Sequence, residues 1–324
     1  ELYEAHPDWV VCHPKREPQT GRGGTQLVLD LSNPKVQDHV FNIVDRLMKE
    51  NPELYYMKWD CNMDINNFGS HYLTADNQSH LYVDYHQGLT KTLQRIREKY
   101  PDLVIQCCAS GGGRVNYGLM PYFDEFWVSD NTDAQQRLFI QYGTSMFFPA
   151  MAMAQHVSAS PNHQTGRVIP LKFRFDVAMT GRLGMEMQPK EMNKDEFEFA
   201  KKAIQEYKGI REIVQFGDQY RLVSPYDNPD LASLMYVSES KDKAVFFAYK
   251  LRSFKIQRFP LVRMAGLDEN AQYKIREINV VDEKRRSYLD GKTVSGRVLM
   301  NTGIELKFDD YDEFASRVFE LVKQ

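Results

Sequence analysis

Apolar runs recur along the first two thirds of the chain, and each is followed by polar loop residues. Six of these runs predict strands: Gln26–Asp30, Leu54–Asp60, "DLVIQCCASGGG", "EFWVSDN", "SMFFPAMAM" and "RVIPLKFRF". Asn33 is placed to cap a helix that begins at Pro34, and Pro101 ends a second helix near Tyr82–Lys99. Strands that alternate with helices at this spacing predict βα units and a parallel sheet.

The pattern changes after a helix predicted around Lys194–Tyr207. Short strand-like runs separated by turn residues then follow, in "ASLMYVSESKDKAVFFAYKL", "AQYKIREINV", "KTVSGRVLM" and "GIELKF". Because these runs have no helices of their own, they predict an antiparallel β domain that begins near Leu222. We therefore place one domain at residues 1–215 and a second at residues 216–324.

The first domain has fewer units than a closed barrel requires. A (β/α)8 barrel has eight strands and takes about 250 residues, whereas six units end here near residue 215. If the parallel sheet belongs to such a barrel, its first strands lie before Glu1.

Composition excludes several classes of protein. Apolar residues make up 42% and charged residues 26% of the chain, which is typical of a globular protein. The net charge is -3 and there is no long basic run, so nucleic acid is a poor candidate partner. No apolar stretch reaches the roughly 18 residues of a membrane helix, and no targeting segment identifies a compartment. The spacing of Cys12, Cys61, Cys107 and Cys108 favours free thiols over a disulfide framework.

Polar residues stand at the ends of four predicted strands: Asp30, Lys58 with Asp60, Ser110–Arg114, and Ser129 with Asp130. In an α/β barrel, the carboxyl ends of the strands build the active site. Asp60 and Asp130 could then form the carboxyl pair of a glycosidase, in which Lys58 favours the ionised form of Asp60. Trp59 and Trp127 each lie beside one of these aspartates, as the wall of a sugar site would.

Each of these features also has a purely structural interpretation. An aspartate at a strand end is usually a cap, and a tryptophan is more often part of the core. The stretch "SGGGRVNYG" lacks the GxGxxG and GK[ST] patterns of a phosphate loop, and His156 and His163 lack a metal-binding HExxH spacing. Arg137 is expected on a solvated or packing face of a helix.

At these residues the sequence resembles glycoside hydrolase family 36, the bacterial-type α-galactosidases. Six segments match in the order of the family: "RGGTQLVLDLSNP", "YYMKWDCN", "CCASGGGRVNYG", "FWVSDNTDAQQRLFIQYGTS", "HVSASPNHQTGR" and "GRLGMEM". The resemblance implies a catalytic (β/α)8 barrel followed by a C-terminal β-sandwich. It also implies hydrolysis of terminal α-linked galactose from oligosaccharides, with retention of configuration and with neither a metal nor an organic cofactor.

The resemblance further assigns roles to residues. The aspartate of the KWD motif, Asp60, matches the nucleophile, and Asp130 in the WxSDN motif matches the acid/base. The remaining matches are sugar-binding candidates: Lys58, Trp127, Cys108, Ser110, Asn62 and Arg22.

The chain also departs from the family pattern. An N-terminal β-sandwich and the acidic DDGW motif of the first barrel strands are not found in this sequence. The first alternative is therefore a non-catalytic fragment, or a sugar-binding or structural portion, of such an enzyme. An α-N-acetylgalactosaminidase and a galactosyl transferase stay open as well, as does assembly into a homo-oligomer through the tail.

Overall fold

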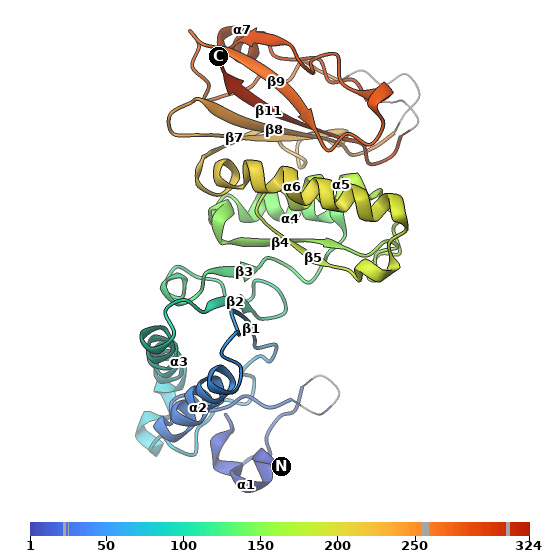
Figure 1. Cartoon of the computed structure of the whole chain (residues 1–324). Helices are drawn as coiled ribbons and strands as arrows, with labels where there is room; N and C mark the ends of the chain where they lie inside the picture. Colours follow the sequence, from blue (N-terminus) through green and yellow to red (C-terminus); the bar gives the residue numbers. More distant parts are fainter. Residues whose placement is uncertain (22–23, 25, 254–258, 309–311) are drawn as a thin grey trace. The chain divides into compact units, whose positions relative to one another are not determined.

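The computed structural model describes residues 1–21, 24, 26–253, 259–308 and 312–324 (Figure 1). The chain divides into two compact units, Glu1–Trp127 and Val128–Gln324, and each is described by itself. Within the described residues, no helix is long and apolar enough to cross a membrane.

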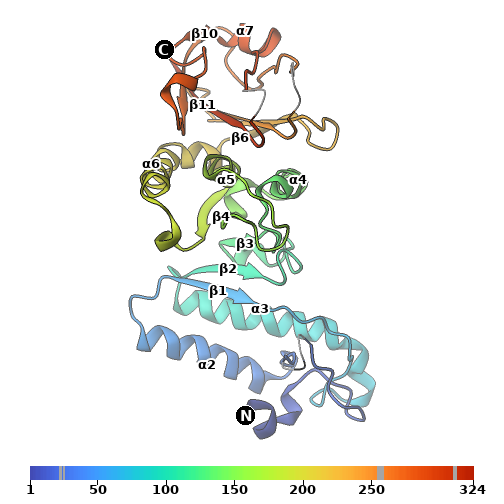
Figure 2. The same ribbon diagram turned by 90° about the vertical axis from the view of Figure 1, so that its right-hand side faces the viewer.

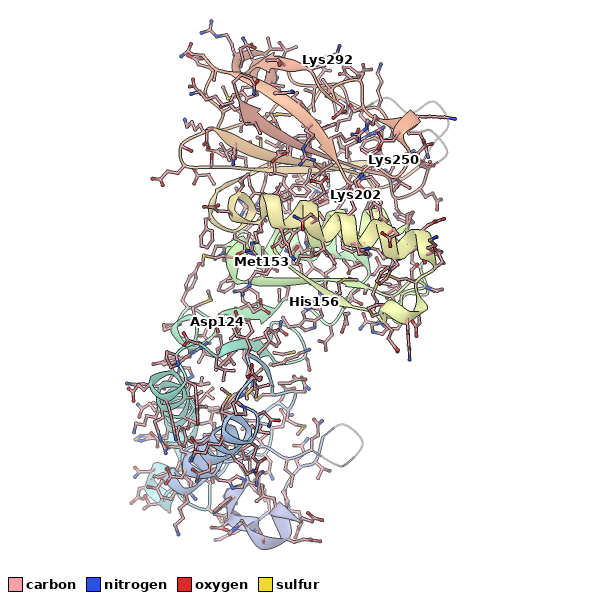
Figure 3. All side chains as sticks on the ribbon, in the orientation of Figure 1. Asp124, Met153, His156, Lys202, Lys250 and Lys292 are labelled. Carbon is pink, nitrogen blue, oxygen red and sulfur yellow. The ribbon has the colours of Figure 1, made fainter. Side chains whose placement is uncertain are left out.

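The first unit contains three parallel strands, β1 (Tyr56–Asp60), β2 (Val104–Cys108) and β3 (Glu125–Trp127). Strand β1 pairs with β2 so that Asp60 lies opposite Cys108. The predicted second, third and fourth strands are therefore confirmed. Asp124, labelled in Figure 3, precedes β3 and accepts a hydrogen bond of 2.7 Å from the Ile105 amide, which links the start of β3 to β2.

Helices α2 (Pro34–Glu50) and α3 (Leu81–Lys99) lie together on one side of β1 and β2 (Figure 2). The Asn33 side chain caps α2 by accepting from the Lys35 amide at 3.0 Å, and Pro34 occupies the first helical position, where no amide hydrogen is needed. Both helices were predicted from their apolar spacing and are confirmed. Their buried faces pack onto the apolar side chains of the two strands, in clusters that include Leu93, Ile96 and Ile105.

The first predicted strand, Gln26–Asp30, is wrong. Its described residues form only isolated bridges, from Gln26 to Gly21 and from Leu29 to Val10. A strand requires a continuous hydrogen-bond ladder with a neighbour, which this apolar run does not make in the described part of the chain. Asp30 is fully buried and accepts from the Ser32 hydroxyl at 2.6 Å and from Ser70, so it has a structural role here. Shorter helices complete this unit: α1 (Leu2–Ala5), η1 (Pro7–Trp9), η2 (Ala75–His80) and η3 (Met120–Tyr122).

The second unit begins with two parallel strands, β4 (Met153–Ser158) and β5 (Arg182–Glu186). Its helices are α4 (Ala134–Thr144), η4 (Ala150–Ala152), α5 (Leu171–Ala178), η5 (Pro189–Glu191) and α6 (Lys194–Phe216). Met153 and His156, labelled in Figure 3, both lie on β4. Helix α6 begins where it was predicted and extends beyond Tyr207; a capping box of Asn193 and Glu196 closes its first turn.

Two strand predictions in this unit need correction. The strand predicted in "SMFFPAMAM" begins only at Met153, because Pro149 and η4 occupy the residues before it. The segment "RVIPLKFRF" is not a strand, since helix α5 starts directly after Pro170. In α5 the apolar residues Leu171, Phe173 and Phe175 alternate with Lys172, Arg174 and Asp176, which is the period of a strand, although every residue except Lys172 is buried in the helix. Strand β5, by contrast, was not predicted.

An antiparallel sheet follows, in the strand order β10-β9-β11-β8-β7-β6. Its strands are β6 (Asp218–Val223), β7 (Leu231–Val237), β8 (Lys243–Lys250), β9 (Gln272–Ile278), β10 (Thr293–Ser295) and β11 (Ser316–Lys323). The predicted antiparallel domain is thus present, although it begins at Asp218 and not near Leu222, and neither β6 nor β11 was predicted. In "KTVSGRVLM" only β10 is a strand, and helix α7 (Gly296–Asn301) follows it. In "GIELKF" a single bridge joins Ile304 to Val262.

Helices α4, α5 and α6 lie between the β4–β5 pair and the antiparallel sheet (Figure 1). Two buried tyrosines of the sheet bond to backbone carbonyls across this layer: the Tyr236 hydroxyl donates to Thr180 and the Tyr249 hydroxyl to Asp176, each at 2.7 Å. The Asp176 carboxylate in turn accepts from the Ser316 hydroxyl at 2.6 Å and from Asn279 at 2.7 Å. Burial raises the pKa of Tyr249 well above its ordinary value, so the hydroxyl stays protonated and remains a donor.

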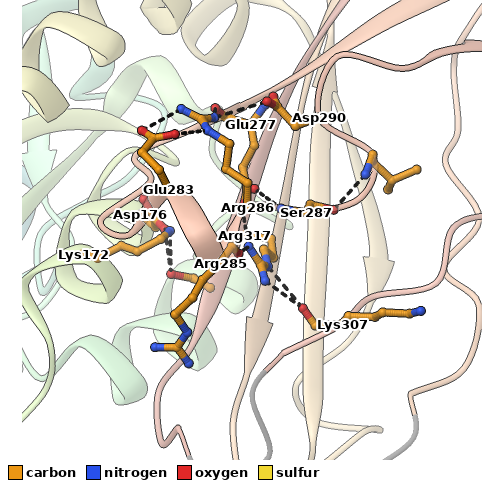
Figure 4. A network of polar contacts seen from close by, with 12 residues as sticks. Lys172, Asp176, Glu277, Glu283, Arg285, Arg286, Ser287, Asp290, Lys307 and Arg317 are labelled. Carbon is orange, nitrogen blue, oxygen red and sulfur yellow. Dashed lines mark hydrogen bonds and ion pairs between the residues drawn. The ribbon is translucent and has the colours of Figure 1, made fainter.

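A polar network extends from this layer over the sheet (Figure 4). Arg317 on β11 donates to the buried Glu277 carboxylate at 2.7 Å and to the Lys307 carbonyl at 3.0 Å. Glu277 also accepts from the Ser287 amide at 2.6 Å.

Along the chain, parallel strands with covering helices precede an antiparallel sheet, as expected for part of an α/β barrel and a C-terminal sheet domain.

Candidate active site

The two faces of β1 differ in polarity. Lys58 and Asp60 are exposed on one face, whereas Met57 and Trp59 are half-buried on the other and pack against the helix-facing apolar clusters. Trp59 is half-buried: it packs against these clusters and also lines the cavity beside β1. The strand is apolar where it meets the helices and polar where it is open.

Cys108 lies opposite Asp60 in the β1–β2 pairing and is 2% exposed. Burial raises the pKa of its thiol, and the neighbouring Asp60 carboxylate raises it further, while the Gly111 backbone and the Lys58 ammonium oppose the shift. The thiol is thus neutral near pH 7 and can act as a weak hydrogen-bond donor beside Asp60.

The side chain of Lys58 faces Trp127, the last residue of β3. Its ammonium nitrogen lies 5.1 Å from the ring centroid, within the range of a cation–π interaction. Trp127 is 3% exposed, so most of its surface already contacts protein.

The loops that follow β1 and β2 are joined by two contacts. The Ser110 amide donates to Asn62 Oδ1 at 2.7 Å, and Arg114 donates to the Met63 carbonyl at 3.3 Å. Ser110 and Gly111 have φ angles of 50° and 86°, a left-handed turn that the glycine adopts without strain. The second loop thereby folds back toward the end of β1.

Arg114 belongs to the polar stretch Ser110–Arg114 that was expected at the end of β2, whereas Tyr85 was not identified as a site residue from the sequence. Arg114 also donates to the Tyr85 hydroxyl at 3.3 Å, so it links helix α3 to the loop after β1. The contact with Tyr85 joins residues 29 positions apart, so no local sequence signal suggested it.

An open cavity of about 580 Å³ runs along β1. Its polar lining residues include Lys58, Asp60 and Asn62, together with Arg114 and Tyr85. Apolar residues of α2 and of segment 26–31 form much of its wall: Leu27, Val28, Leu29, Leu31, Val40, Ile43, Val44 and Leu47. Its remaining lining residues are Gln26, Met57, Trp59, Cys61, Met63 and Leu89. The cavity volume is in the range of small-molecule sites.

Asp130 belongs to the second unit, where it is exposed in the segment between β3 and α4. The Asn131 amide next to it donates to the Ser129 hydroxyl at 3.1 Å, and Asp133 caps α4 by accepting from Gln135 at 2.9 Å. Arg137 was expected on a solvated or packing face; it is buried, so the packing alternative holds.

The remaining sequence predictions concern cysteines, metal ligands and Arg22. All four cysteines are free thiols, as predicted. In the described part of the chain, no three His, Cys, Asp or Glu side chains are arranged to hold a metal ion. Arg22 lies outside the described residues.

Known proteins resemble both parts of this chain. The family described as Melibiase matches residues 1–217, and the Glycosyl hydrolase family 36 C-terminal domain matches residues 231–321. Alpha-galactosidase AgaA of Geobacillus stearothermophilus is 36% identical over 321 residues, which are 99% of this chain and 42% of the relative. Alpha-galactosidase C of Emericella nidulans is 37% identical over 325 residues, which are 100% of this chain and 39% of the relative. The chain thus spans about two fifths of the length of these curated relatives.

Solved structures agree with this result. The crystal structure of AgaA from Geobacillus stearothermophilus superimposes with a TM-score of 0.91 at 35% identity and covers 100% of this chain and 43% of the other. Variants of the same enzyme, each at 34% identity and with the same TM-score of 0.91 and the same coverage, were crystallised with raffinose and with stachyose.

Proposed function

This chain belongs to glycosyl hydrolase family 36, the melibiase family, and we propose from that premise that it carries the catalytic carboxyl groups of a retaining α-galactosidase. The resemblance of the six sequence segments is thereby confirmed. The observation that carries the proposal is that Lys58 and Asp60 lie on the same face of β1, line a cavity of about 580 Å³ and adjoin the neutral Cys108 thiol.

In the proposed reaction Asp60 is the nucleophile and Asp130 is the acid/base. Asp60 attacks the anomeric carbon while Asp130 protonates the leaving oxygen, which gives a galactosyl–Asp60 ester. Asp130 then takes a proton from water, and the water hydrolyses the ester. A retaining mechanism requires the two carboxyl groups to lie about 5 to 5.5 Å apart in the working enzyme, and a measured separation of roughly 6.5 to 9.5 Å would contradict it.

The other side chains are proposed to bind the sugar. Lys58 would donate to galactose hydroxyls, and Cys108 would lie beside the second carbon of the ring. Because a thiol at that position leaves little room for an acetamido group, it favours galactose over N-acetylgalactosamine. The other residues proposed to bind the sugar are Trp127, Ser110, Asn62 and Arg22. Transfer of galactose to a second sugar is the alternative to hydrolysis.

We also propose the finer architecture. The parallel strands belong to a (β/α)8 barrel whose first strands are not in this sequence, and the antiparallel part belongs to a β-sandwich, with the domain boundary at 215/216. The substrates proposed are α-galactoside oligosaccharides of the kind found in the complexes of the Geobacillus enzyme, raffinose and stachyose.

The second candidate function is that of a portion of such an enzyme that has no turnover of its own. The chain matches only 42% of the length of a relative, which favours this candidate.

The deciding experiment measures nitrophenol release from α- and β-linked nitrophenyl glycosides. Turnover of the α-galactoside that is lost in Asp60→Asn and kept in Asp64→Asn, an exposed carboxylate just after β1, supports the enzyme. If none of the glycosides is hydrolysed, the second candidate is favoured.

A further inference from the structure

Arg137 holds the backbone on both sides of Asp130. It lies in the first turns of α4 and is 3% exposed. Its Nε donates to the Asn131 carbonyl and its Nη2 donates to the Ser129 carbonyl, each at 2.7 Å. These two carbonyls belong to the residues that flank Asp130, so one side chain holds the backbone just before and just after it.

The helix dictates this contact. The Arg137 amide donates to the Asp133 carbonyl at 2.8 Å, so the residue lies one turn after the cap of α4. Long side chains on a helix point back toward its N-terminus, which here is the segment that leads from β3. The same segment is held further along, because the Asp133 carboxylate pairs with Arg167 at 2.6 Å.

The buried guanidinium also lies within electrostatic range of Asp130. Burial lowers the pKa of Arg137 to about 10, while the Glu186 and Asp130 carboxylates oppose this lowering. Arg137 therefore stays positively charged near pH 7. Hydrogen bonds from a charged donor are stronger than neutral ones. The two bonds from Arg137 therefore restrain the segment around Asp130, which lies outside helices and strands.

We propose that Arg137 is a positioning residue for Asp130. By binding the carbonyls of Ser129 and Asn131, it holds the flanking backbone so that the Asp130 carboxyl group meets the leaving oxygen of a bound α-galactoside. The inference rests on the proposed function through the acid/base role of Asp130. It predicts that replacing Arg137 lowers kcat/KM more for substrates with poor leaving groups than for activated substrates, because a displaced acid cannot protonate a poor leaving group.

Arg174 provides a matched control in the same unit. It lies on α5, is 6% exposed, and donates to the carbonyls of Ile169 at 3.0 Å and Ser158 at 2.5 Å. Burial lowers the pKa of this arginine too. The two arginines thus make the same kind of contact, but neither carbonyl bound by Arg174 adjoins Asp130.

The test compares Arg137→Met, Arg137→Lys and Arg174→Met on raffinose, which has a poor leaving group, and on 4-nitrophenyl α-galactoside, which has a good one. We expect Arg137→Met to lower kcat/KM for raffinose by on the order of tenfold to a hundredfold more than for the nitrophenyl substrate, mainly through kcat. Arg137→Lys should restore part of the difference, and Arg174→Met should leave the ratio at the wild-type value. Equal losses on both substrates in Arg137→Met, or the same discrimination in Arg174→Met, would overturn the inference.

The ratio of the kcat/KM values for the two substrates, measured on one preparation, does not depend on how much of the variant is folded. If the wild-type chain hydrolyses neither substrate, the proposed function has failed, and hydrogen exchange then decides the positioning. The Asn131 amide should exchange on the order of tenfold faster in Arg137→Met, at unchanged exchange in β7 and β8 and in Arg174→Met. Unchanged exchange at Asn131 would overturn the positioning itself.

Discussion

The ammonium group of Lys58 lies 5.1 Å from the centroid of the Trp127 ring. The two residues come from β1 and β3, and β2 pairs with both strands between them. Because a buried indole restrains the lysine, its charge is held on the face of β1 that also carries Asp60. The two residues should therefore differ in their effect on activity when each is replaced.

Replacing Lys58 with Met should lower kcat/KM for 4-nitrophenyl α-galactoside by about tenfold to a hundredfold. Met keeps most of the stem but loses a charged donor, and hydrogen bonds to charged groups contribute about 1.5 to 3 kcal/mol. Trp127→Phe keeps an aromatic face and should cost only about 0.5 to 1 kcal/mol, or roughly two- to fivefold. Steady-state kinetics of both variants check this, and a Lys58→Met enzyme as active as Trp127→Phe would contradict it.

Replacing Asp130 with Ala or Asn should affect substrates according to their leaving groups. Raffinose needs protonation of its leaving oxygen, whereas a nitrophenolate departs without it, so the loss on raffinose should be larger by about 10² or more. Competition between raffinose and the nitrophenyl galactoside in a single reaction measures the difference directly. Identical losses would remove Asp130 from the acid role.

Asp45 on α2 should make the free energy of unfolding depend on pH in the acidic range. Hydrogen bonds from Lys49, Lys99 and Tyr100 hold the pKa of its carboxyl well below the usual value. A depressed pKa contributes stability above the unfolded value of about 3.9, and this contribution is lost as the pH falls further. Asp45→Asn should therefore lower the urea midpoint at pH 7, and the difference from wild type should shrink below about pH 4.

The control for this prediction is Asp38→Asn. Asp38 lies on the same helix, and its exposed carboxylate pairs with Arg95 at 2.8 Å. Exposed pairs contribute little, so its midpoint should stay close to wild type at both pH values. A difference for Asp45→Asn that persists unchanged at low pH would show that the effect is not electrostatic.

Two helical glycines should respond in opposite directions to alanine. A Cβ on Gly88 of α3 would lie 1.7 Å from the Leu31 carbonyl oxygen, so Gly88→Ala should destabilise the fold by about 1 to 3 kcal/mol or more. A Cβ on Gly209 of α6 would meet nothing within 4 Å, so Gly209→Ala should stabilise by about 0.5 to 1 kcal/mol. Urea unfolding of the two variants checks both signs, and destabilisation by Gly209→Ala would count against the packing described for α6.

Local sequence determined the elements that carry their own signals. Helix α2 has Asn33 and Pro34 at its start and a regular apolar face, and β1 alternates between exposed and half-buried residues. The family motifs around Asp60 and Asp130 were recognisable for the same reason, since each is a short contiguous string. These features depend on neighbours in the chain, which a sequence displays.

Only the tertiary structure decided the features that depend on distant partners. Seven of the eight residues at Leu171–Ala178 are buried because both the β4–β5 pair and the antiparallel sheet cover the helix, and in sequence its polar and apolar residues alternate as in a strand. Segment 26–30 is apolar but makes no hydrogen-bond ladder in the described part of the chain. Trp59 and Trp127 look alike in sequence, yet one packs into the core beneath the helices and the other beneath the Lys58 ammonium. In each case burial and hydrogen bonding are properties of the surroundings, and the chain acquires them only when it folds.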